Sequence, residues 1–479
     1  MLMISTRPRL VTGALLLGAL ASTGMAAQTP FGASALFDTS EYALGSHMLN
    51  VVFIQDDQLR DPTDSSHPVV PGGTVIHWTA AELASRSQRV LDAAAYWNNE
   101  SAARHHPGAR LDMRVNFVND GNPITVANIG GEGSTIGYGD ALAVLDPQYG
   151  SFSDVTAVRH FTHDSREAME TNWASTVFVK PYNGRASAYL NGPIVNAYED
   201  DSTWTHAHEY GHTFGALDEY GSATTSSRAG YLYELNTNAV NLPGGGSNPN
   251  SIPAVMRTRN VYTISDGTLG QIGWRDTDND TVPDILDTFP SLTLDGSDSH
   301  SGLGLAQLDI SSVVTPLPSP DPNEGDYTIN TIQAADYRLG DGNWQTLNPL
   351  DGGFGDYEES FFFQLADLPY GQHEIQVRVQ NSVENYSEES FAFFSTLVTP
   401  DFNADGQMDC TDVDALVVQI VDETHGPAFD LDGNGWVDHQ DLQQWLVEGG
   451  AANLPSGAPY LLGDANLDGT VDGQDFLVW

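Results

Sequence analysis

The sequence predicts a multidomain protein with an α+β domain first, then a β-sandwich, and last a small α-helical module. Its 479 residues correspond to roughly three domains at about 150 residues per domain. Helical and strand periodicities mix in the first half, whereas period-two alternation dominates residues 325–397. From residue 398 onward, Asp/Asn/Gly loops alternate with short helix-like stretches. An apolar fraction of 40% is enough for packed cores in all three.

The α+β domain is expected to cover residues 28–272. Apolar patterning predicts strands at residues 49–55 and 111–118, with an amphipathic helix over residues 80–101 between them. A further strand is expected within residues 188–198. Two interpretations of it stay open: an edge strand that pairs with an extended substrate peptide, or an ordinary core strand.

The middle of the chain predicts a different architecture. Residues 325–397 alternate apolar and polar side chains between turn signals such as Gly340-Asp341-Gly342. This pattern is typical of a β-sandwich of the immunoglobulin or fibronectin type. Residues 291–324, which include a Pro-rich stretch, are expected to form a linker.

The charge of the chain restricts its partners. There are 18 Lys+Arg against 64 Asp+Glu, a formal net charge of −46. Nucleic acids and anionic membranes require a basic surface, so both are excluded as partners. An acidic surface favours a secreted protein or one that binds divalent cations. The single cysteine, Cys410, excludes a disulfide within the chain.

The N-terminus is typical of an export signal. Arg7 and Arg9 precede an apolar run over residues 10–21, and small residues follow at Ala26-Ala27. The run is too short to span a membrane, which needs about 18 apolar residues, and no later stretch reaches that length. We therefore expect residues 1–27 to be a signal peptide and the protein to be extracellular.

One motif predicts a metal site. His208-Glu209-x-x-His212 places two imidazoles four residues apart, on one face of a helix. Two imidazoles and one carboxylate are a usual set of ligands for catalytic zinc, which lowers the pKa of bound water to about 7. Glu209, adjacent to His208, is placed to take a proton from that water.

The surroundings of the motif predict how a third ligand arrives. Ser202 is a candidate N-cap, and Gly215 is suited to the left-handed conformation that ends a helix. The resulting turn brings Asp218 back toward the imidazoles. Its neighbour Glu219 is the rival third ligand. The oxyanion of the reaction would be stabilised by zinc together with one of three side chains, between which the sequence does not choose: Tyr220, Arg257 and Tyr262.

The string His-Glu-x-x-His-x-x-Gly-x-x-Asp resembles the extended zinc signature of metzincin-type metalloproteases. It is also similar to the signature of secreted bacterial peptidases related to immunoglobulin-A-cleaving enzymes. In metzincins a methionine turn lies beneath the zinc, and residues 254–257 fit that segment. The resemblance implies a protein or peptide substrate, three zinc ligands, a general base and a structural methionine: His208, His212 and Asp218; Glu209; and Met256.

Four stretches repeat one spacing of side-chain oxygens, at positions 1, 3, 5, 9 and 12 of a twelve-residue loop. This spacing can surround a hard cation, and calcium is the expected one outside a cell. The predicted calcium ligands are Asp276, Asp278, Asp280, Asp284 and Asp287; Asp401, Asn403, Asp405, Asp409 and Asp412; Asp430, Asp432, Asn434, Asp438 and Asp441; and Asp464, Asn466, Asp468, Asp472 and Asp475.

The first loop, in residues 273–290, resembles the calcium repeats of thrombospondin type 3. The other three, in residues 398–479, resemble dockerin repeats. The dockerin resemblance implies a cohesin-like scaffold partner, often within assemblies that degrade polysaccharides. The whole pattern predicts a secreted zinc metalloendopeptidase attached through calcium-dependent repeats. Two alternatives stay open: a non-catalytic calcium-binding adhesion or scaffold protein, and an accessory component of an extracellular polysaccharide-degrading complex.

Overall fold

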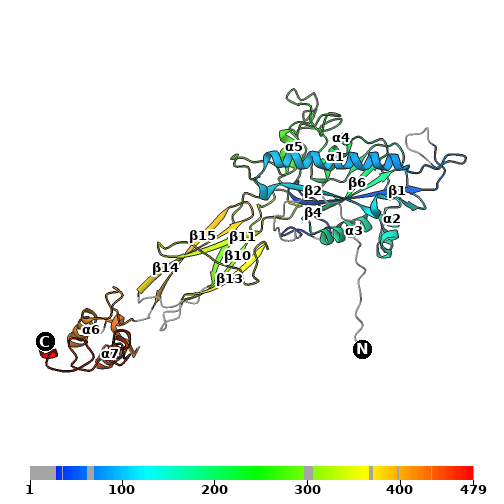
Figure 1. Ribbon diagram of the computed structural model, residues 1–479. Coiled ribbons are helices and arrows are strands. Elements are labelled where there is room, and N and C mark those ends of the chain that lie inside the picture. Colours follow the sequence, from blue (N-terminus) through cyan, green and yellow to red (C-terminus); the bar gives the residue numbers. More distant parts are fainter. Residues whose placement is uncertain are drawn as a thin grey trace, which may run out of the picture.

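A computed structural model of the chain describes residues 29–34, 36–61, 69–295, 306–365, 371–395, 399–424, 426–432 and 434–477. A mixed α/β domain, a domain of two sheets and a small helical module follow one another along the chain (Figure 1). The expected signal peptide, residues 1–27, lies outside the described residues. Among the described helices, none has the length and apolar character needed to cross a membrane.

The first domain (residues 29–290) is built on a sheet with the strand order β2-β1-β4-β6-β5. Adjacent strands are parallel except the edge strand β5, which pairs antiparallel with β6. A short strand, β3, pairs with the end of β1. The bounds are β1 (Gly45–Asp56), β2 (Leu111–Phe117), β3 (Ile124–Val126), β4 (Trp173–Lys180), β5 (Ser187–Ala188) and β6 (Ile194–Tyr198).

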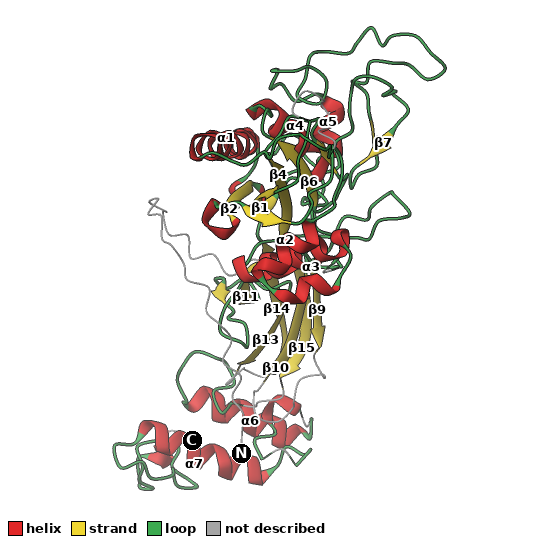
Figure 2. Ribbon diagram, turned by 90° about the vertical axis from the view of Figure 1, so that its right-hand side faces the viewer, coloured by secondary structure: helices red, strands yellow, loops and turns green. Residues whose placement is uncertain are grey.

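Helices cover both faces of this sheet (Figures 1 and 2). Leu49 and Val51 of β1 pack in one core with α1 and α4, whereas Val52 and Ile54 pack in a second core with α2 and α3. A strand buried on both faces needs apolar side chains on both, and β1 supplies them in the run of residues 51–54. The helices are α1 (Ala80–Arg104), α2 (Tyr138–Leu145), α3 (Asp154–Met169), α4 (Thr203–Thr213) and α5 (Asp266–Gln271).

The expected elements of this domain are found, with one change. The strands at 49–55 and 111–118 are β1 and β2, and the helix at 80–101 is α1, which begins at a capping box of Thr79 and Glu82. The strand expected within residues 188–198 is divided by a turn. Its second part, β6, is a fully buried core strand, and the edge position belongs to β5.

The second domain consists of two sheets, β13-β10-β9 and β12-β11-β14-β15. Leu308 and Ile310 of the first sheet share one hydrophobic core with Ile375 and Val377 of the second. The bounds are β9 (Ser291–Asp295), β10 (Ala306–Val313), β11 (Ile332–Leu339), β12 (Gln345–Thr346), β13 (Glu358–Leu365), β14 (Gly371–Asn381) and β15 (Tyr386–Ser395).

The predicted linker, residues 291–324, is corrected by this topology. Its first part forms β9 and β10, because the apolar side chains of these strands cover the apolar face of the opposite sheet. Its last part lies on the first domain, where the Ser319 hydroxyl donates to the Tyr231 carbonyl oxygen at 2.8 Å. The two-sheet domain therefore begins near residue 291 instead of 325.

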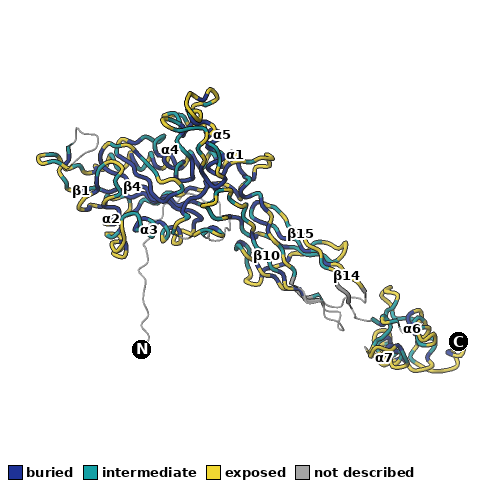
Figure 3. The backbone as a smooth tube through the Cα atoms, turned by 180° about the vertical axis from the view of Figure 1, so that it is seen from behind, coloured by how far each residue is buried: buried dark blue, intermediate teal, exposed yellow. Residues whose placement is uncertain are grey.

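The C-terminal module (residues 399–477) contains α6 (Cys410–Asp422) and α7 (His439–Asn453). Leu416 and Trp445 form its small core with Val437 and Tyr460. Figure 3 shows that buried backbone is concentrated in the first domain and that much of this module is exposed. The remaining short elements are β7 (Arg228–Ala229), β8 (Glu234–Leu235), and the 3-10 helices at Pro107–Ala109, Val118–Gly121, Pro147–Ser151, Pro427–Phe429 and Asp475–Leu477.

Candidate metal centre

The helix α4 carries the His-Glu-x-x-His motif and begins and ends as its sequence predicts. The hydroxyl of Ser202, its N-cap, accepts from the Thr205 N–H at 3.1 Å. The helix ends before Gly215, whose φ of +92° is in the left-handed region. A Cβ at Gly215 would also lie 2.7 Å from the Cα of Gly230, so glycine is required here for two reasons. The chain reverses at this turn and returns Asp218 to the helix.

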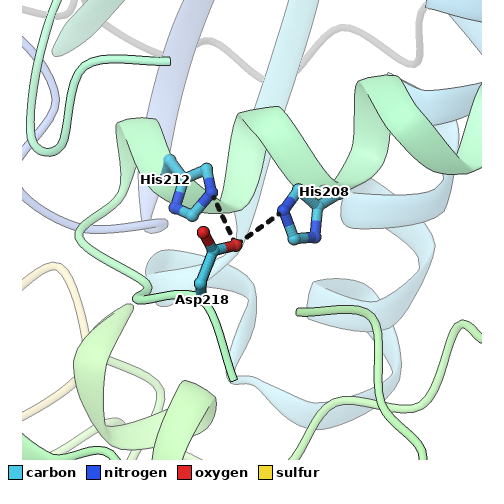
Figure 4. Close-up of side chains that lie close together, drawn as sticks. All are labelled: His208, His212 and Asp218. Carbon is cyan, nitrogen blue, oxygen red and sulfur yellow. Dashed lines mark hydrogen bonds and ion pairs between the residues drawn. The ribbon is translucent and has the colours of Figure 1, made fainter. Parts of the chain in front are cut away.

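Three side chains converge below α4 (Figure 4). Oδ1 of Asp218 lies 3.1 Å from Nε2 of His208 and 3.4 Å from Nε2 of His212. Ligand atoms of all three residues lie within 4.8 Å of one another. The structure therefore brings together two ring nitrogens and a carboxylate oxygen from the predicted positions.

Hydrogen bonds on the far side of each imidazole fix its orientation. Nδ1 of His208 lies 3.0 Å from the Val255 carbonyl oxygen, and Nδ1 of His212 lies 2.7 Å from that of Ala216. A carbonyl only accepts, so each Nδ1 carries a hydrogen, and each Nε2 faces Asp218 and would present its lone pair to a metal ion once it has lost its own proton. Metal-binding histidines are usually oriented in this way. The donor set thus fits a zinc ion.

Electrostatic interactions within the group keep the Asp218 carboxylate ionised. Burial raises the pKa of Asp218, but hydrogen bonds from His208 and His212 outweigh it and hold that pKa below its ordinary value. Burial raises the pKa of Glu209, against the opposing attraction of His212 and His208. Glu209 is 6% exposed, and its Oε2 has no hydrogen-bond partner among the described residues.

Glu219, the rival third ligand, points into a different polar cluster. Its carboxylate is fully buried and accepts from the hydroxyls of Ser265 and Thr268 and from the Asn238 amide. Through Ser265 and Thr268, these hydrogen bonds connect the segment that follows Asp218 to the N-terminus of α5. Asp218, rather than Glu219, faces the two imidazoles.

Met256 lies beneath the helix that carries the imidazoles. Its side chain is fully buried, and a Cβ added to Gly211 would lie 2.7 Å from its Sδ. Gly211 is therefore needed for α4 to approach Met256 closely. The carbonyl of the preceding Val255 is the one that orients His208.

The cluster opens into a cavity of about 560 Å³. Part of its wall is the edge of the sheet at β5, and another part is the Gly-rich loop that precedes α2. The lining residues are Glu132, Gly133, Arg185, Ala186, Ser187, Ala188, Glu209, His212, Asp218 and Tyr220. A cavity that lies beside His208, His212 and Asp218 and beside the last strand of the sheet suits an extended peptide.

The cavity distinguishes among the three candidate oxyanion stabilisers. Tyr220 lines it, whereas Arg257 and Tyr262 do not. Sequence reasoning missed Glu132 and Arg185, which come from segments without a recognisable motif. The one signal for Arg185 was its position, just before the strand expected near the site.

The Asp-rich loops gather carboxylates to different degrees. Oxygens of Asp276, Asp278 and Asp280 lie within 4.8 Å of one another. The other two predicted ligands of that loop bond to protein: Asp284 accepts from Arg275 and Thr277, and Asp287 accepts from Asn385. In the third loop, Asp430, Asp432 and Asp441 form a similar group.

The three loops of the C-terminal module share one hydrogen-bond pattern. In the first of them, the carboxylate of Asp412 accepts from the N–H groups of Phe402, Asn403 and Asp409. Asp441 and Asp475 accept from the equivalent positions of their own loops. The last position of each twelve-residue loop thus closes it, and in the second of these loops the carboxylate of Asp441 also lies within 4.8 Å of those of Asp430 and Asp432.

Comparisons with known proteins find only distant structural similarity. No family model matches the chain, and no curated protein matches it. Wild-type OgpA from Akkermansia muciniphila is 11% identical over 74% of this chain and 94% of its own, with a TM-score of 0.22. Catalytically inactive OgpA from the same organism, in complex with an O-glycopeptide, is 10% identical over 78% and 98%, with a TM-score of 0.20. The CARDB domain of PF1109 from Pyrococcus furiosus is 14% identical over 22% and 96%, with a TM-score of 0.15. TM-scores this low do not establish a common fold.

Proposed function

We propose that this protein is a zinc-dependent metalloendopeptidase. The observation that carries the proposal is the convergence of His208 Nε2, His212 Nε2 and Asp218 Oδ1 at the wall of a cavity that Glu209 also lines. Both imidazoles are oriented by backbone carbonyls, as ligands need to be. A solvated helix face would need neither these hydrogen bonds nor a turn that returns a carboxylate to them.

The chain's own residues would divide the work of peptide hydrolysis. A zinc ion held by the three ligands would polarise the peptide carbonyl and lower the pKa of a water molecule. Glu209 would take the proton of the attacking water on its unpartnered Oε2 and deliver it to the leaving amine. The Tyr220 hydroxyl, in the same cavity, would donate a hydrogen bond to the developing oxyanion.

The edge strand would hold the substrate. Ser187 and Ala188 pair with β6 on one side only, since β5 is the last strand in the sheet order. Both residues line the cavity. An extended peptide would add to this edge through backbone hydrogen bonds, which places a peptide bond near the metal ligands without requiring a particular sequence.

The remaining parts of the proposal concern location and attachment. Export through residues 1–27 would place the enzyme where calcium is plentiful. Calcium in the Asp-rich loops would then stabilise the C-terminal module, which would bind a cohesin-like scaffold partner. The shared pattern of the three loops supports the idea that they bind the same ligand.

Casein cleavage and zinc content, measured together on Glu209→Gln, test the proposal. We expect the wild type to cleave casein with about one zinc per chain, and the variant to retain zinc while its kcat falls by a factor on the order of 100 to 10,000. Glu170→Gln, an exposed position on the other side of the sheet, is the matched control. A zinc-loaded wild type without proteolysis would instead favour the adhesion or scaffold alternative.

A further inference from the structure

One cation faces the cavity. Among the described residues that line it, Arg185 is the only Lys or Arg. Its Nη2 lies 3.4 Å from the Tyr220 hydroxyl, and its guanidinium forms no ion pair with a described carboxylate. Other arginines of this acidic chain do find one: Arg60 and Arg86 meet carboxylates at 2.5 and 3.0 Å.

No carboxylate that lines the cavity forms an ion pair with the Arg185 guanidinium, although Asp218 and Glu209 attract it through space. Glu132 accepts from the backbone N–H of Arg185 at 3.2 Å, not from its guanidinium. Asp218 lies against the two imidazoles. A guanidinium has five N–H donors, and the described contacts use one of them. The others are free to bind a planar, bidentate acceptor, and a carboxylate is the acceptor that this geometry matches best.

The position of Arg185 places such an acceptor beside the reaction centre. Arg185 precedes the edge residue Ser187 by two positions, and both residues line the cavity. Its partner Tyr220 has its ring centroid 5.9 Å from that of His208. A substrate held along β5 with its scissile bond at the metal ligands would therefore bring a neighbouring residue to the guanidinium.

We propose that Arg185 is a specificity-determining residue, which binds a substrate carboxylate within one or two residues of the scissile bond. This inference rests on the proposed peptidase function. The carboxylate is that of an Asp or Glu side chain or of a free C-terminus. The net charge of −46 repels acidic peptides, but surface charges that lie more than about 8 Å from the peptide are largely screened at physiological salt. The contact in the cavity then decides which peptide is preferred.

A structural role for Arg185 predicts a different result. If Arg185 only positioned the Tyr220 hydroxyl, its loss would lower turnover of all peptides by the same factor. A carboxylate contact affects acidic peptides selectively and acts mainly through KM. The two roles therefore differ in the ratio of kcat/KM between an acidic peptide and its uncharged counterpart.

The test is a digest of a mixed peptide library by zinc-loaded wild type, Arg185→Gln and Arg185→Lys, with each cleavage site mapped by mass spectrometry. The cleaved sequences then give matched peptides with Glu or Gln at the selected position, and with a free or amidated C-terminus. Comparison of these pairs separates the two sources of carboxylate. Arg114→Gln is the control, because Arg114 is exposed on β2 at the opposite edge of the sheet.

We expect the kcat/KM of the wild type to be about tenfold or more higher for the acidic peptide of one pair than for its uncharged counterpart. A ratio of this size corresponds to one hydrogen bond to a charged group. In Arg185→Gln that ratio should fall to about one, while Arg185→Lys keeps part of it. No acidic preference in an active wild type, or an equal loss on both peptides of a pair, would overturn the role of Arg185. A zinc-loaded wild type that cleaves no peptide would instead overturn the proposed function.

Discussion

The Nδ1 of His212 donates a hydrogen bond to the carbonyl oxygen of Ala216 at 2.7 Å. This bond connects the last turn of α4 to the segment that follows it, across the left-handed Gly215. The same turn thus orients one imidazole and returns Asp218 to it. The arrangement of His212 and Asp218 therefore depends on a backbone conformation that few residues other than glycine adopt.

Gly215→Ala should disrupt the proposed zinc site. The added Cβ meets the Gly230 backbone at 2.7 Å in a left-handed conformation, so the turn has to shift and the His212 hydrogen bond with it. We expect a 10- to 100-fold loss of zinc affinity, as for other losses of a ligand's supporting hydrogen bond. Competition titration with a zinc chelator measures it. Gly244→Ala is the control, since Gly244 has a φ of +82° but open space around it; an equal effect there would contradict the account.

Asp218→Asn and Glu219→Gln should separate the ligand from its neighbour. Asp218→Asn should lose zinc, because an uncharged amide replaces the carboxylate that faces both imidazoles. Glu219→Gln should retain zinc but destabilise the domain by about 1 to 3 kcal/mol, because the buried hydrogen bonds to Ser265 and Thr268 are weakened. Zinc content and thermal unfolding of both variants measure this. The reverse result would make Glu219 the ligand.

Asp201 should make the stability of the first domain depend on pH. Burial raises the pKa of Asp201 to about 8, although the Tyr198 N–H donates to its carboxylate at 2.7 Å. In the unfolded chain the pKa is about 3.9, so between pH 4 and 8 the folded state binds more protons. The stabilisation that comes from the raised pKa of Asp201 is therefore fully present below pH 4, and it is lost as the pH rises to about 8.

Asp201→Asn removes this titration. The variant should match the wild type near pH 4 and exceed it by roughly 1 to 3 kcal/mol at pH 8, since the amide oxygen can still accept from Tyr198. Urea unfolding at several pH values, followed by fluorescence of the buried Trp97 and Trp173, measures the difference. A difference that does not change with pH would contradict the buried, protonated state of Asp201.

Calcium should stabilise the C-terminal module. Its loops hold carboxylates close together, and a ligand that binds only the folded state at 100 times its Kd adds about 2.7 kcal/mol. The unfolding midpoint reported by the buried Trp445 should rise with calcium and fall with a chelator. Asp432→Asn should reduce the response, unlike Asp422→Asn at the exposed end of α6. An unfolding midpoint that does not change with calcium concentration would contradict the proposal that these loops bind calcium.

The local parts of the site could be predicted from sequence. The His208–His212 spacing fixes one helix face, Ser202 starts that helix, and Gly215 ends it. All three depend on backbone rules that act within a few residues. The sequence left Glu219 open as an alternative to Asp218. The contacts that hold Glu219 away from the imidazoles come from Ser265 and Thr268, which lie far along the chain.

The non-local parts could not be predicted. β9 and β10 were predicted to be linker, because their stability depends on contacts between distant segments: β10 pairs with β13, β9 pairs with β10, and both cover the opposite sheet. Arg185 and Glu132 enter the cavity because the topology brings a strand edge and a Gly-rich loop together. No spacing in the sequence records that proximity.

The central claim is that His208, His212 and Asp218 hold one zinc ion. Metal analysis of the purified, dialysed chain, beside a His208→Ala/His212→Ala double variant, tests it most directly. The account predicts about one zinc per wild-type chain and none in the double variant, with an unchanged far-UV circular dichroism spectrum. A zinc-free wild type, or equal zinc in both proteins, would contradict it.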